Sequence, residues 1–463
     1  MPDPIHTPSD RWRVLIPRRH ASEVLALAEQ AACNLPEVRV PQNQRLAWHL
    51  NAEVKHHWQL EVVSIKPVDL GSQPLEDGAA RYHVAELLFP NAPLPDGMQW
   101  ASVSSLTPQS LPTPGDFGAL RAFLKEMSDP AGKDAPFGHL GWLREVTSWI
   151  RDAIGPFALE WNGRFEQFHA SAWFSLMRLE TAPRAAWFKA VGEPNTREFR
   201  ITLELANRYP EYVPRILAVR PDWNAWLAEE CPGKTLDRIL EIDLWRNAAR
   251  ALARLQIESS SRPEELLRAG AHNLDMFLSQ PAVEQFLAVA EKLISENPRP
   301  RPIDPTLDDL SAMTDQLREL LDHAEKLRVP NALGHLDLNA GNVIVSSERC
   351  AYLDWAEAYV GLPFLTFEYF LQQFRRVFGH EAPRESAVVE THLATWEQVL
   401  PRSDVREAWA LTPALAVFAY ASRCVAASVP YGTGVPRIAN YLRTLLRKLK
   451  RELENCTASK AGV

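Results

Sequence analysis

The alternation of apolar and polar residues changes character near residue 140 of the chain. Before that point, short apolar runs alternate with polar residues as in half-buried strands, and one segment has helical spacing. The pattern predicts strands over residues 12–16, 58–63, 82–88 and 100–103 and a helix over 22–32. After it, a helical segment over 140–154 leads into a strand-rich stretch over 167–191, and long helical patterns follow to the end.

Proline clusters suggest where the domains are joined. They lie over residues 106–117 and 128–138, on either side of a short helix predicted over 119–127. We therefore expect an N-terminal α+β domain over 1–106, a proline-rich linker with a short helix over 107–139, a β-rich lobe over 140–230 and a helical lobe over 231–463. That order is typical of a two-lobed nucleotide-dependent transferase.

The first of these domains offers no chemistry of its own. Its strand order is similar to that of a Nudix domain, but the closely spaced glutamates that would hold a metal against a diphosphate are absent from it. Its role stays open between covering a cleft, binding a protein partner and sensing a ligand.

Composition narrows the class of protein. The 463 residues predict two or three domains, and 50 Lys and Arg against 58 Asp and Glu give a net charge of −8, which argues against a nucleic-acid partner. The five cysteines form no CxxC pair, so neither a disulfide framework nor a zinc site is predicted. The first residues contain no apolar leader, and we expect a cytoplasmic protein.

Two apolar segments near the end could suggest a membrane. Residues 408–429 form an apolar stretch, but Pro413 and Arg423 interrupt it, and we predict a buried helix. Residues 437–451 have one apolar face and six basic residues, as in a membrane-surface or partner helix. We favour a terminal helix that packs on its own domain, and expect no membrane partner.

The candidate chemistry lies in the segment GHLDLNAGNVIV, followed by AYLDWAEA. Two short strands, 343–345 and 351–353, form a predicted hairpin with Asp337 before it, Asn342 at its start and Asp354 at its end. Phosphoryl transfer needs a carboxylate for the proton of the attacking hydroxyl and oxygen ligands for Mg²⁺. Asp337 suits the first task, and Asn342 and Asp354 suit the second. His335 could brace the loop by hydrogen bonds.

HLDLNAGN together with LDWAEAYVGLPF resembles the aminoglycoside phosphotransferase-like kinase family, which includes choline, homoserine and fructosamine kinases. The resemblance extends over about residues 140–463 and implies an α+β, two-lobed, protein-kinase-like fold that uses ATP and Mg²⁺. It implies that Asp337 is the catalytic base and that Asn342 and Asp354 are the Mg²⁺ ligands. Leu336 replaces a glycine of the family pattern.

A kinase also needs a cation for the α and β phosphates and a carboxylate that holds this cation. Lys189 lies in the middle of a predicted strand, and Glu198 lies in the first turn of a helix predicted over 197–208. We expect these two to pair, with Glu204 as the rival carboxylate. The resemblance implies that residues 227–230 form the hinge whose backbone binds the adenine.

Two departures from the family pattern qualify the resemblance. The stretch where a glycine-rich phosphate loop is expected, 162–175, contains only Gly163, which leaves ATP affinity open. Thr366 stands near the position of a structural aspartate of the family, which leaves open how the neighbouring loop is braced.

The favoured function is an ATP- and Mg²⁺-dependent transfer of the γ-phosphate to a hydroxyl of a small molecule. The alternative is a pseudokinase-like nucleotide-binding regulatory or scaffold protein, against which the joint presence of the four expected site residues argues. A protein kinase is disfavoured because Trp-Ala-Glu follows Asp354 in place of Phe-Gly. Glu357, Glu368 and Gln372 are candidate contacts to the acceptor, whose identity is open between an antibiotic and a metabolite.

Overall fold

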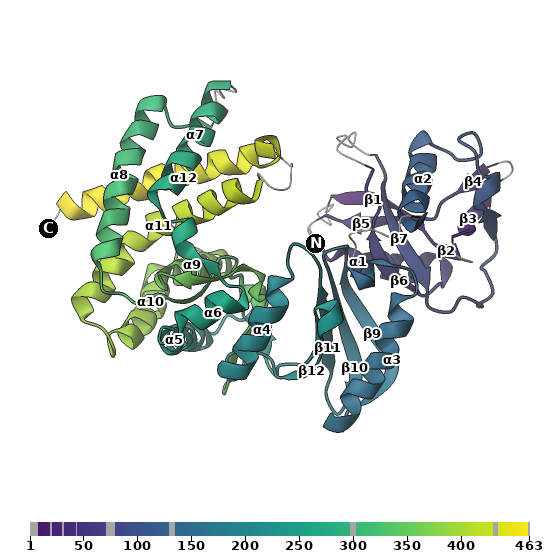
Figure 1. The fold of residues 1–463 in the computed structure, drawn as a ribbon, viewed down its shortest axis with the longest axis horizontal. Helices are drawn as coiled ribbons and strands as arrows, with labels where there is room; N and C mark the ends of the chain where they lie inside the picture. The colour runs from purple at the N-terminus through teal and green to yellow at the C-terminus, as the bar shows by residue number, and fades with distance from the viewer. Residues whose placement is uncertain are drawn as a thin grey trace, which may run out of the picture. The chain divides into compact units, whose positions relative to one another are not determined.

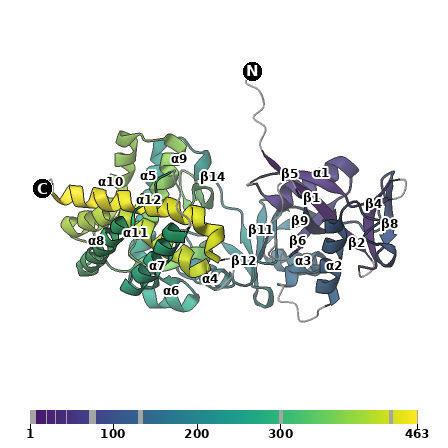
Figure 2. The same ribbon diagram turned by 90° about the horizontal axis from the view of Figure 1, so that it is seen from above.

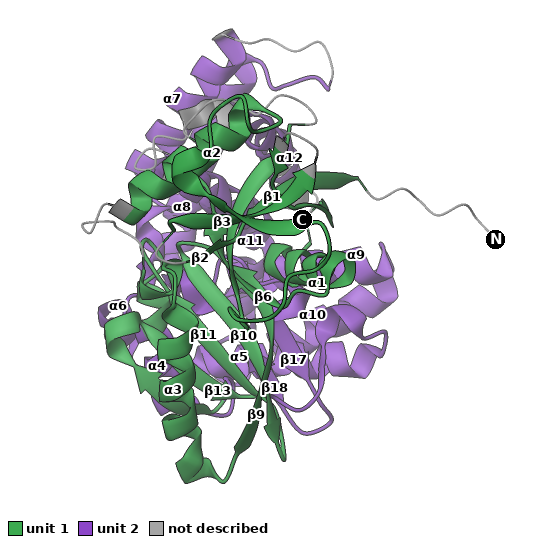
Figure 3. Ribbon diagram, turned by 90° about the vertical axis from the view of Figure 1, so that its right-hand side faces the viewer, with its two compact units in different colours: residues 1–199, 215–230 green, residues 200–214, 231–463 purple. Residues whose placement is uncertain are grey.

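The computed structural model describes residues 8–18, 21–29, 32–42, 44–70, 79–128, 135–296, 302–428 and 434–461. The chain forms two compact units, drawn in different colours in Figure 3. Unit 1 comprises Met1–Phe199 and Arg215–Glu230, and unit 2 comprises Arg200–Pro214 and Cys231–Val463. The expected boundary at residue 230 coincides with the end of unit 1, whereas the expected boundaries at 106 and 139 fall inside it.

The first half of unit 1 contains two small sheets. One has the order β5-β1-β7-β6, in which β1 and β7 are parallel and the other neighbours antiparallel. In the other, β3 pairs with β2, β4 and β8. The strands are β1 (Ser9–Leu15), β2 (Pro17–Arg18), β3 (Glu23–Glu29), β4 (Ala32–Asn34), β5 (Glu37–Pro41), β6 (Val62–Pro67), β7 (Arg81–Leu87) and β8 (Met98–Ser102).

Two predictions for this region were wrong. The helix predicted over 22–32 is replaced by β3 over Glu23–Glu29 and, after two residues outside the described part, by the start of β4 at Ala32. Pairing of β3 with β2 and β8 overrides the helix propensity of the sequence EVLALAE. Trp58 ends the helix α1 (Leu46–Trp58), and the strand predicted over 58–63 begins at Val62.

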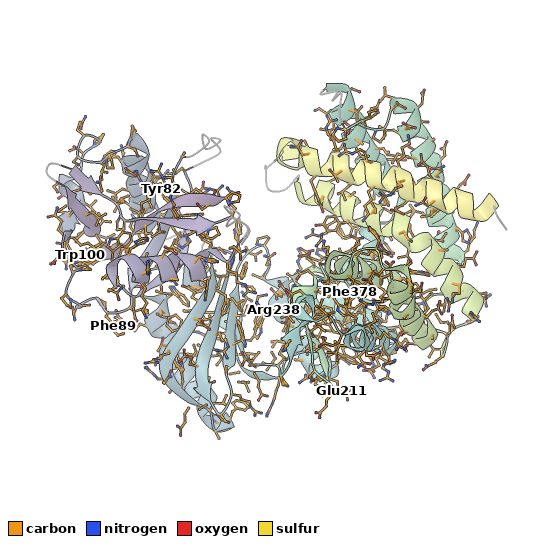
Figure 4. All side chains as sticks on the ribbon, turned by 180° about the vertical axis from the view of Figure 1, so that it is seen from behind. Tyr82, Phe89, Trp100, Glu211, Arg238 and Phe378 are labelled. Carbon is orange, nitrogen blue, oxygen red and sulfur yellow. The ribbon has the colours of Figure 1, made fainter. Side chains whose placement is uncertain are left out.

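The segment expected to be a linker contributes to the core of unit 1. It contains α2 (Pro114–Ser128), which is longer than the predicted helix, and the short helix η2 (Pro136–Gly138). Leu120 and Phe137 are buried, and the buried Asp116 pairs with Arg13. Asp116 also accepts a hydrogen bond of 2.9 Å from Tyr82, which is labelled in Figure 4. The sequence between α2 and η2 lies partly outside the described residues.

The second half of unit 1 is an antiparallel sheet of five strands with the order β12-β13-β11-β10-β9. In Figure 1 helix α3 lies along one face of this sheet, where Trp142 stacks on Phe188 at 6.4 Å between ring centroids. The elements are α3 (Trp142–Ile154), β9 (Glu160–Ala170), β10 (Phe174–Ala182), β11 (Ala186–Val191), β12 (Ile216–Arg220) and β13 (Ala225–Glu229). Helix α4 (Arg197–Arg208) follows β11 in the sequence.

A buried polar network joins the two halves of unit 1. Gln167 on β9 is 3% exposed, and its side chain donates to the carbonyl of Ser64 at 2.8 Å and accepts from the Ser64 N–H at 2.8 Å. Asn51 on α1 donates to the same Gln167 oxygen at 3.0 Å. The side chain of Gln167 thus satisfies backbone groups of β6, so the sheet of β9–β13 and the N-terminal sheets share one interior.

Unit 2 is mainly helical, with two three-stranded sheets of short strands, ordered β14-β17-β18 and β15-β19-β16. The strands are β14 (Lys234–Thr235), β15 (His272–Asn273), β16 (Ala332–His335), β17 (Val343–Val345), β18 (Cys350–Tyr352) and β19 (Ala358–Gly361). The longer helices are α5 (Ile242–Ser259), α6 (Pro263–Ala269), α7 (Gln280–Glu296), α8 (Leu307–Lys326), α9 (Phe364–Phe378), α10 (Ala382–Trp396), α11 (Arg402–Ser428) and α12 (Gly434–Ala461).

The two apolar C-terminal segments are core helices. One helix among the described residues, over Arg402–Ala426, is long and apolar enough to cross a membrane, but 67% of its most apolar window is buried in the protein. It packs with α12 (Figure 2) in a cluster that includes Leu415, Leu442 and Leu446. On α12, Arg443 and Arg447 pair with Asp304, and Lys450 pairs with Asp309. These pairs neutralise part of its basic face.

Candidate active site

The predicted hairpin is present in unit 2. Strands β17 and β18 pair antiparallel with Val343 opposite Tyr352, and the short helix η7 (Ala340–Asn342) precedes β17. The carbonyl of Asn342 accepts a hydrogen bond of 2.8 Å from the N–H of Leu353. Asn342 and Asp354 therefore lie at the same end of the hairpin, which is the arrangement expected of two ligands to one ion.

The backbone of Asp354 has a conformation that few residues other than glycine adopt. Its φ is 64° and its ψ is 60°, in the left-handed region, and the residue begins the short helix η8 (Trp355–Glu357). Asp tolerates this region better than most residues, but at a cost relative to glycine. A strained backbone conformation persists only where the surrounding structure holds it. The hairpin and η8 therefore determine the direction in which the side chain of Asp354 projects from the backbone.

Asp337 lies on the loop after β16, and His335 orients this loop. The Nδ1 of His335 accepts a hydrogen bond from the N–H of Asp337 at 3.1 Å, while its Nε2 lies 3.4 Å from the carbonyl of Leu353. These partners assign the tautomer with the proton on Nε2. Burial lowers the pKa of His335, which keeps the ring neutral. One neutral imidazole thus connects the Asp337 loop to the strand that leads to Asp354.

Thr366 braces the same loop from α9. Its hydroxyl accepts a hydrogen bond of 2.8 Å from the N–H of His335 and donates one of 3.0 Å to the hydroxyl of Tyr359. The threonine at this position therefore supplies the bracing that the sequence left open. Leu336 is 1% exposed and packs in the core next to Tyr359 and Leu365, so its side chain has a place in the fold where the family pattern has glycine.

The electrostatics of the loop affect Asp337 itself. The pKa of Asp337 lies above its ordinary value, chiefly because neighbouring protein removes water from the carboxylate and further because Asp354 and Glu357 are negative. The positive charge of Arg423 acts in the opposite direction. A raised pKa brings a carboxylate nearer to the range in which it exchanges a proton with a hydroxyl in the transition state.

In unit 1, Lys189 pairs with Glu198. The Nζ of Lys189 on β11 lies 2.5 Å from Oε1 of Glu198 on α4, and the side chains are 14% and 3% exposed. The rings of Phe174 and Trp226 lie 5.7 and 5.8 Å from the same ammonium. The rival Glu204 forms an ion pair with Arg208. The carboxylate in the first turn of α4 is therefore the partner, as the sequence predicts.

The three residues predicted to contact the acceptor lie in different surroundings. Glu357 lies beside the Asp337 loop, because its carbonyl accepts a hydrogen bond of 3.0 Å from the N–H of Leu336. Its carboxylate forms an ion pair with Arg423 on α11. The other two candidates are on α9, where Glu368 accepts hydrogen bonds from Gln372 and Arg375.

Glu368 is buried in a network on α9. Its Oε1 accepts from Arg375 at 3.0 Å and from Gln372 at 3.4 Å, and Arg375 also pairs with Glu385 at 2.5 Å. Burial raises the pKa of Glu368 against the field of Arg375. Glu368 is 4% exposed, so this geometry favours a structural role over a contact to a ligand.

The turn between β9 and β10 stands where the phosphate loop is expected. The hydroxyl of Ser171 accepts hydrogen bonds from the N–H groups of Trp173 at 3.2 Å and Phe174 at 3.1 Å. Trp173 is 60% exposed at the tip of the turn. Gly163 lies near the start of β9, away from this turn. Two backbone amides of the turn are thus already hydrogen-bonded, which is unlike a loop that presents free amides to a phosphate.

Sequence reasoning missed Arg423 in unit 2 and Ser171 in unit 1. Arg423 was recognised only as an interruption of an apolar helix, although a single arginine in such a segment needs a partner, and Glu357 is that partner. Ser171 gave no signal in the sequence beyond the single glycine of the segment 162–175.

Together the antiparallel sheet with its Lys–Glu pair and the helical unit with its Asp-bearing hairpin define a protein-kinase-like, α+β fold, as the sequence predicts. Residues 182–403 match the model of the family described as "Phosphotransferase enzyme family". The predicted resemblance to the aminoglycoside phosphotransferase-like family is therefore confirmed over this range. The match supports a small-molecule phosphotransferase.

Solved structures of low sequence identity are also similar to the chain. A choline kinase from Cryptosporidium parvum is 13% identical, with a TM-score of 0.47, over 67% of this chain and 96% of that one. An ethanolamine kinase from Plasmodium vivax is 13% identical, with a TM-score of 0.44, over 67% and 88%. A spectinomycin phosphotransferase in complex with ADP and spectinomycin is 12% identical, with a TM-score of 0.40, over 64% and 92%. A comparison with curated protein sequences found no match.

Proposed function

We propose that the chain transfers the γ-phosphate of ATP, with Mg²⁺, to a hydroxyl group of a small molecule. One observation carries the proposal: a neutral, buried His335 holds the Asp337 loop against the strand that ends in Asp354, with Asn342 at the same end of the hairpin. A carboxylate fixed by its own backbone, beside a second carboxylate and an amide, is a suitable donor set for phosphoryl transfer.

Asp337 is the proposed catalytic base. Its carboxylate accepts the hydrogen bond of the acceptor hydroxyl and orients the oxygen toward the γ-phosphorus. The bond from this oxygen to phosphorus forms, the bond from phosphorus to the β,γ-bridging oxygen breaks, and the products are the phosphorylated acceptor and ADP. The hydroxyl proton passes to Asp337 and from there to solvent. The ammonium of Lys189, held by Glu198, is the proposed cation for the non-transferred phosphates.

Asp354 and Asn342 fit Mg²⁺ in chemical character. Mg²⁺ is usually bound through one or two carboxylates together with phosphate oxygens and water. The carboxylate of Asp354 and the amide oxygen of Asn342 are ligands of this kind. No group of three or more His, Cys, Asp or Glu that could hold a metal occurs in the part of the chain that the structure describes. When bound, Mg²⁺ neutralises charge that develops on the phosphates.

Thermal unfolding tests the metal site first. We expect ATP with Mg²⁺ to raise the unfolding midpoint of the wild type, and Asp354→Ala to remove the metal-dependent part of that rise. The control is Asp315→Ala, at a residue whose side chain is 76% exposed on α8. Release of ADP in the presence of hydroxylated acceptors then tests turnover, with Asp337→Asn as the inactive variant. An unfolding midpoint of the wild type that changes with neither nucleotide nor metal would falsify the proposal.

A second candidate is a nucleotide-binding regulatory protein without turnover. The observation that favours it is the turn between β9 and β10, where the N–H groups of Trp173 and Phe174 already donate hydrogen bonds to the hydroxyl of Ser171. The same experiments separate the two functions. Binding of ATP with Mg²⁺, but no ADP release with any hydroxylated acceptor, supports the regulatory protein.

A further inference from the structure

The Glu357–Arg423 ion pair lies directly beside the proposed catalytic loop. Strands β16 and β19 place His335 opposite Ala358, and the next hydrogen bond along, at 3.0 Å, joins the N–H of Leu336 to the carbonyl of Glu357. Glu357 is thus the cross-strand neighbour of the residue before Asp337. Because Arg423 pairs with its carboxylate, the guanidinium lies close enough to lower the pKa of Asp337.

Both carboxylates that could have attracted a cationic acceptor are compensated by arginine. Glu357 is paired with Arg423, and Glu368 is paired with Arg375 at 3.0 Å. The positive charge of Lys448 also acts on Glu368. A cation that enters beside Asp337 would therefore meet carboxylates whose charge is compensated, although the Oε2 atoms of Glu357 and Glu368 have no hydrogen-bond partner among the described residues. Such a cation would lose hydration and gain less attraction than it would from an uncompensated carboxylate.

Arg423 has hydrogen-bonding capacity beyond this pair. A guanidinium carries five N–H donors, and the described bond to Glu357 comes from Nη2 alone. The side chain is 23% exposed, so part of it remains accessible while the pair holds its position. Donors fixed in this way suit oxygen atoms of hydroxyl or carboxylate groups, which a guanidinium binds with a defined direction.

We propose that the phosphoryl acceptor is a neutral or anionic, oxygen-rich compound, a polyol or hydroxy acid, whose oxygen atoms accept hydrogen bonds from Arg423. The assignment rests on the proposed function and names its substrate class. Arg423 then determines specificity: it binds the acceptor beside the hydroxyl that Asp337 orients, and by compensating the charge of Glu357 it removes the attraction that an ammonium group would otherwise find there.

Matched acceptors test the assignment. Release of ADP is measured with pentoses, hexoses, glycerol and glycerate, each beside an analogue in which an amino group replaces one hydroxyl, and with choline and kanamycin as cationic references. The neutral or anionic member of the productive pair should exceed its amino analogue in kcat/KM by about tenfold or more. Preference for the cationic members overturns the proposal. So does a panel in which every neutral and anionic member is inactive while ATP with Mg²⁺ still stabilises the protein.

Variants of the Glu357–Arg423 ion pair test whether Arg423 causes the preference among acceptors. Arg423→Gln should raise KM for the productive acceptor about tenfold, with the stabilisation by ATP and Mg²⁺ unchanged, and should reduce the preference over the amino analogue. Because that variant leaves Glu357 without its arginine partner, with His272 at 3.8 Å, the double variant Glu357→Gln with Arg423→Gln removes both charges of the pair and should show the same rise in KM. An unchanged KM and an unchanged preference in the folded double variant refute the role of Arg423. If the wild type fails to bind nucleotide at all, the proposed function fails and the acceptor assignment with it.

Discussion

The Nδ1 of His335 accepts a hydrogen bond from the backbone N–H of Asp337, two residues along the chain, at 3.1 Å. The same ring reaches the carbonyl of Leu353, next to Asp354, at 3.4 Å. One buried side chain therefore sets the spacing between the proposed base and the proposed metal ligand. It can do so only as the neutral tautomer, since a charged imidazolium has no lone pair left to accept the Asp337 N–H.

Replacing His335 should consequently impair turnover more than nucleotide binding. In His335→Ala the Asp337 loop loses its fixed hydrogen bond, and we expect kcat to fall about a hundredfold while ATP with Mg²⁺ still raises the unfolding midpoint. His335→Asn, whose side-chain oxygen can accept one hydrogen bond, should recover part of the loss. The measurements are initial rates of ADP release and thermal unfolding of the same preparations. Equal rates for the wild type and the alanine variant would contradict the positioning role.

The pair Lys189–Glu198 is expected to be worth far more than the neighbouring pair on the same helix. Glu198→Gln leaves a nearly buried ammonium without its counter-charge, and should lower the free energy of unfolding by about 3 kcal/mol and weaken the binding of ATP. Glu204→Gln is the matched control, because its ion pair with Arg208 is partly exposed and should cost less than about 1 kcal/mol. Urea unfolding and nucleotide titration measure both. Equal effects of the two changes would argue against a special role for Glu198.

The proposed site residues also show which contacts can be predicted from the sequence alone. The pairing of Lys189 with Glu198, and the hairpin that carries Asn342 and Asp354, follow from short spacings within one segment. Contacts made across long separations were not predictable: Arg423 lies 66 residues from Glu357. Arg423 makes Glu357, predicted as a candidate contact to the acceptor, one half of an ion pair.

In the fold as well, elements determined by the local sequence were predicted correctly, and elements determined by distant segments were not. Helix α4 and strand β11 were predicted because their apolar periods are clear within one window. The segment over 22–32 was predicted wrongly because its partner β8 lies far along the chain, at Met98–Ser102. The proline-rich segment over 107–139 was expected to be a linker, and its residue Phe137 is 1% exposed because the core of unit 1 extends over it.

The network around Gln167 predicts that the N-terminal sheets and the sheet of β9–β13 unfold together. Gln167→Leu removes the partners of the Ser64 N–H and carbonyl, and two unsatisfied buried backbone groups should cost about 2–4 kcal/mol. Gln42→Leu, whose side chain makes an exposed bond to Asp10, is the control and should cost about 0.5 kcal/mol or less. The comparison is made by urea unfolding. A small effect of Gln167→Leu would mean that the two halves of unit 1 are energetically independent.

Buried neutral histidines should make the protein less stable in mild acid. His392 is fully buried, its ring is stacked on Phe367 at 3.8 Å, and desolvation lowers its pKa to about 3. Below the ordinary histidine pKa of about 6.5 the unfolded chain takes up a proton that the folded protein does not, so stability falls as pH falls. From pH 7.5 to pH 5 this group alone should cost about 2 kcal/mol.

The substitution His392→Phe keeps an aromatic ring and removes the titrating group. We expect the loss of unfolding free energy between pH 7.5 and pH 5 to be smaller than in the wild type by about 2 kcal/mol, whatever the variant's stability at pH 7.5. His57→Phe, at an exposed position of α1, is the control for the substitution itself. An unchanged pH dependence in His392→Phe would show that this histidine is protonated in the folded protein.

Asp354 allows backbone strain to be separated from ligand binding. Its φ of 64° is costly for a residue with a Cβ and free for glycine, so Asp354→Gly should be more stable than Asp354→Ala by about 1 kcal/mol in the absence of ligands. Both variants lack the carboxylate and should lose the Mg²⁺-dependent part of the stabilisation by ATP. Urea unfolding gives the first comparison and thermal unfolding with ATP, with and without Mg²⁺, gives the second. If Asp354→Gly were the less stable variant, the left-handed backbone would not be a source of strain; if it kept the Mg²⁺ effect, Asp354 would not be the metal ligand.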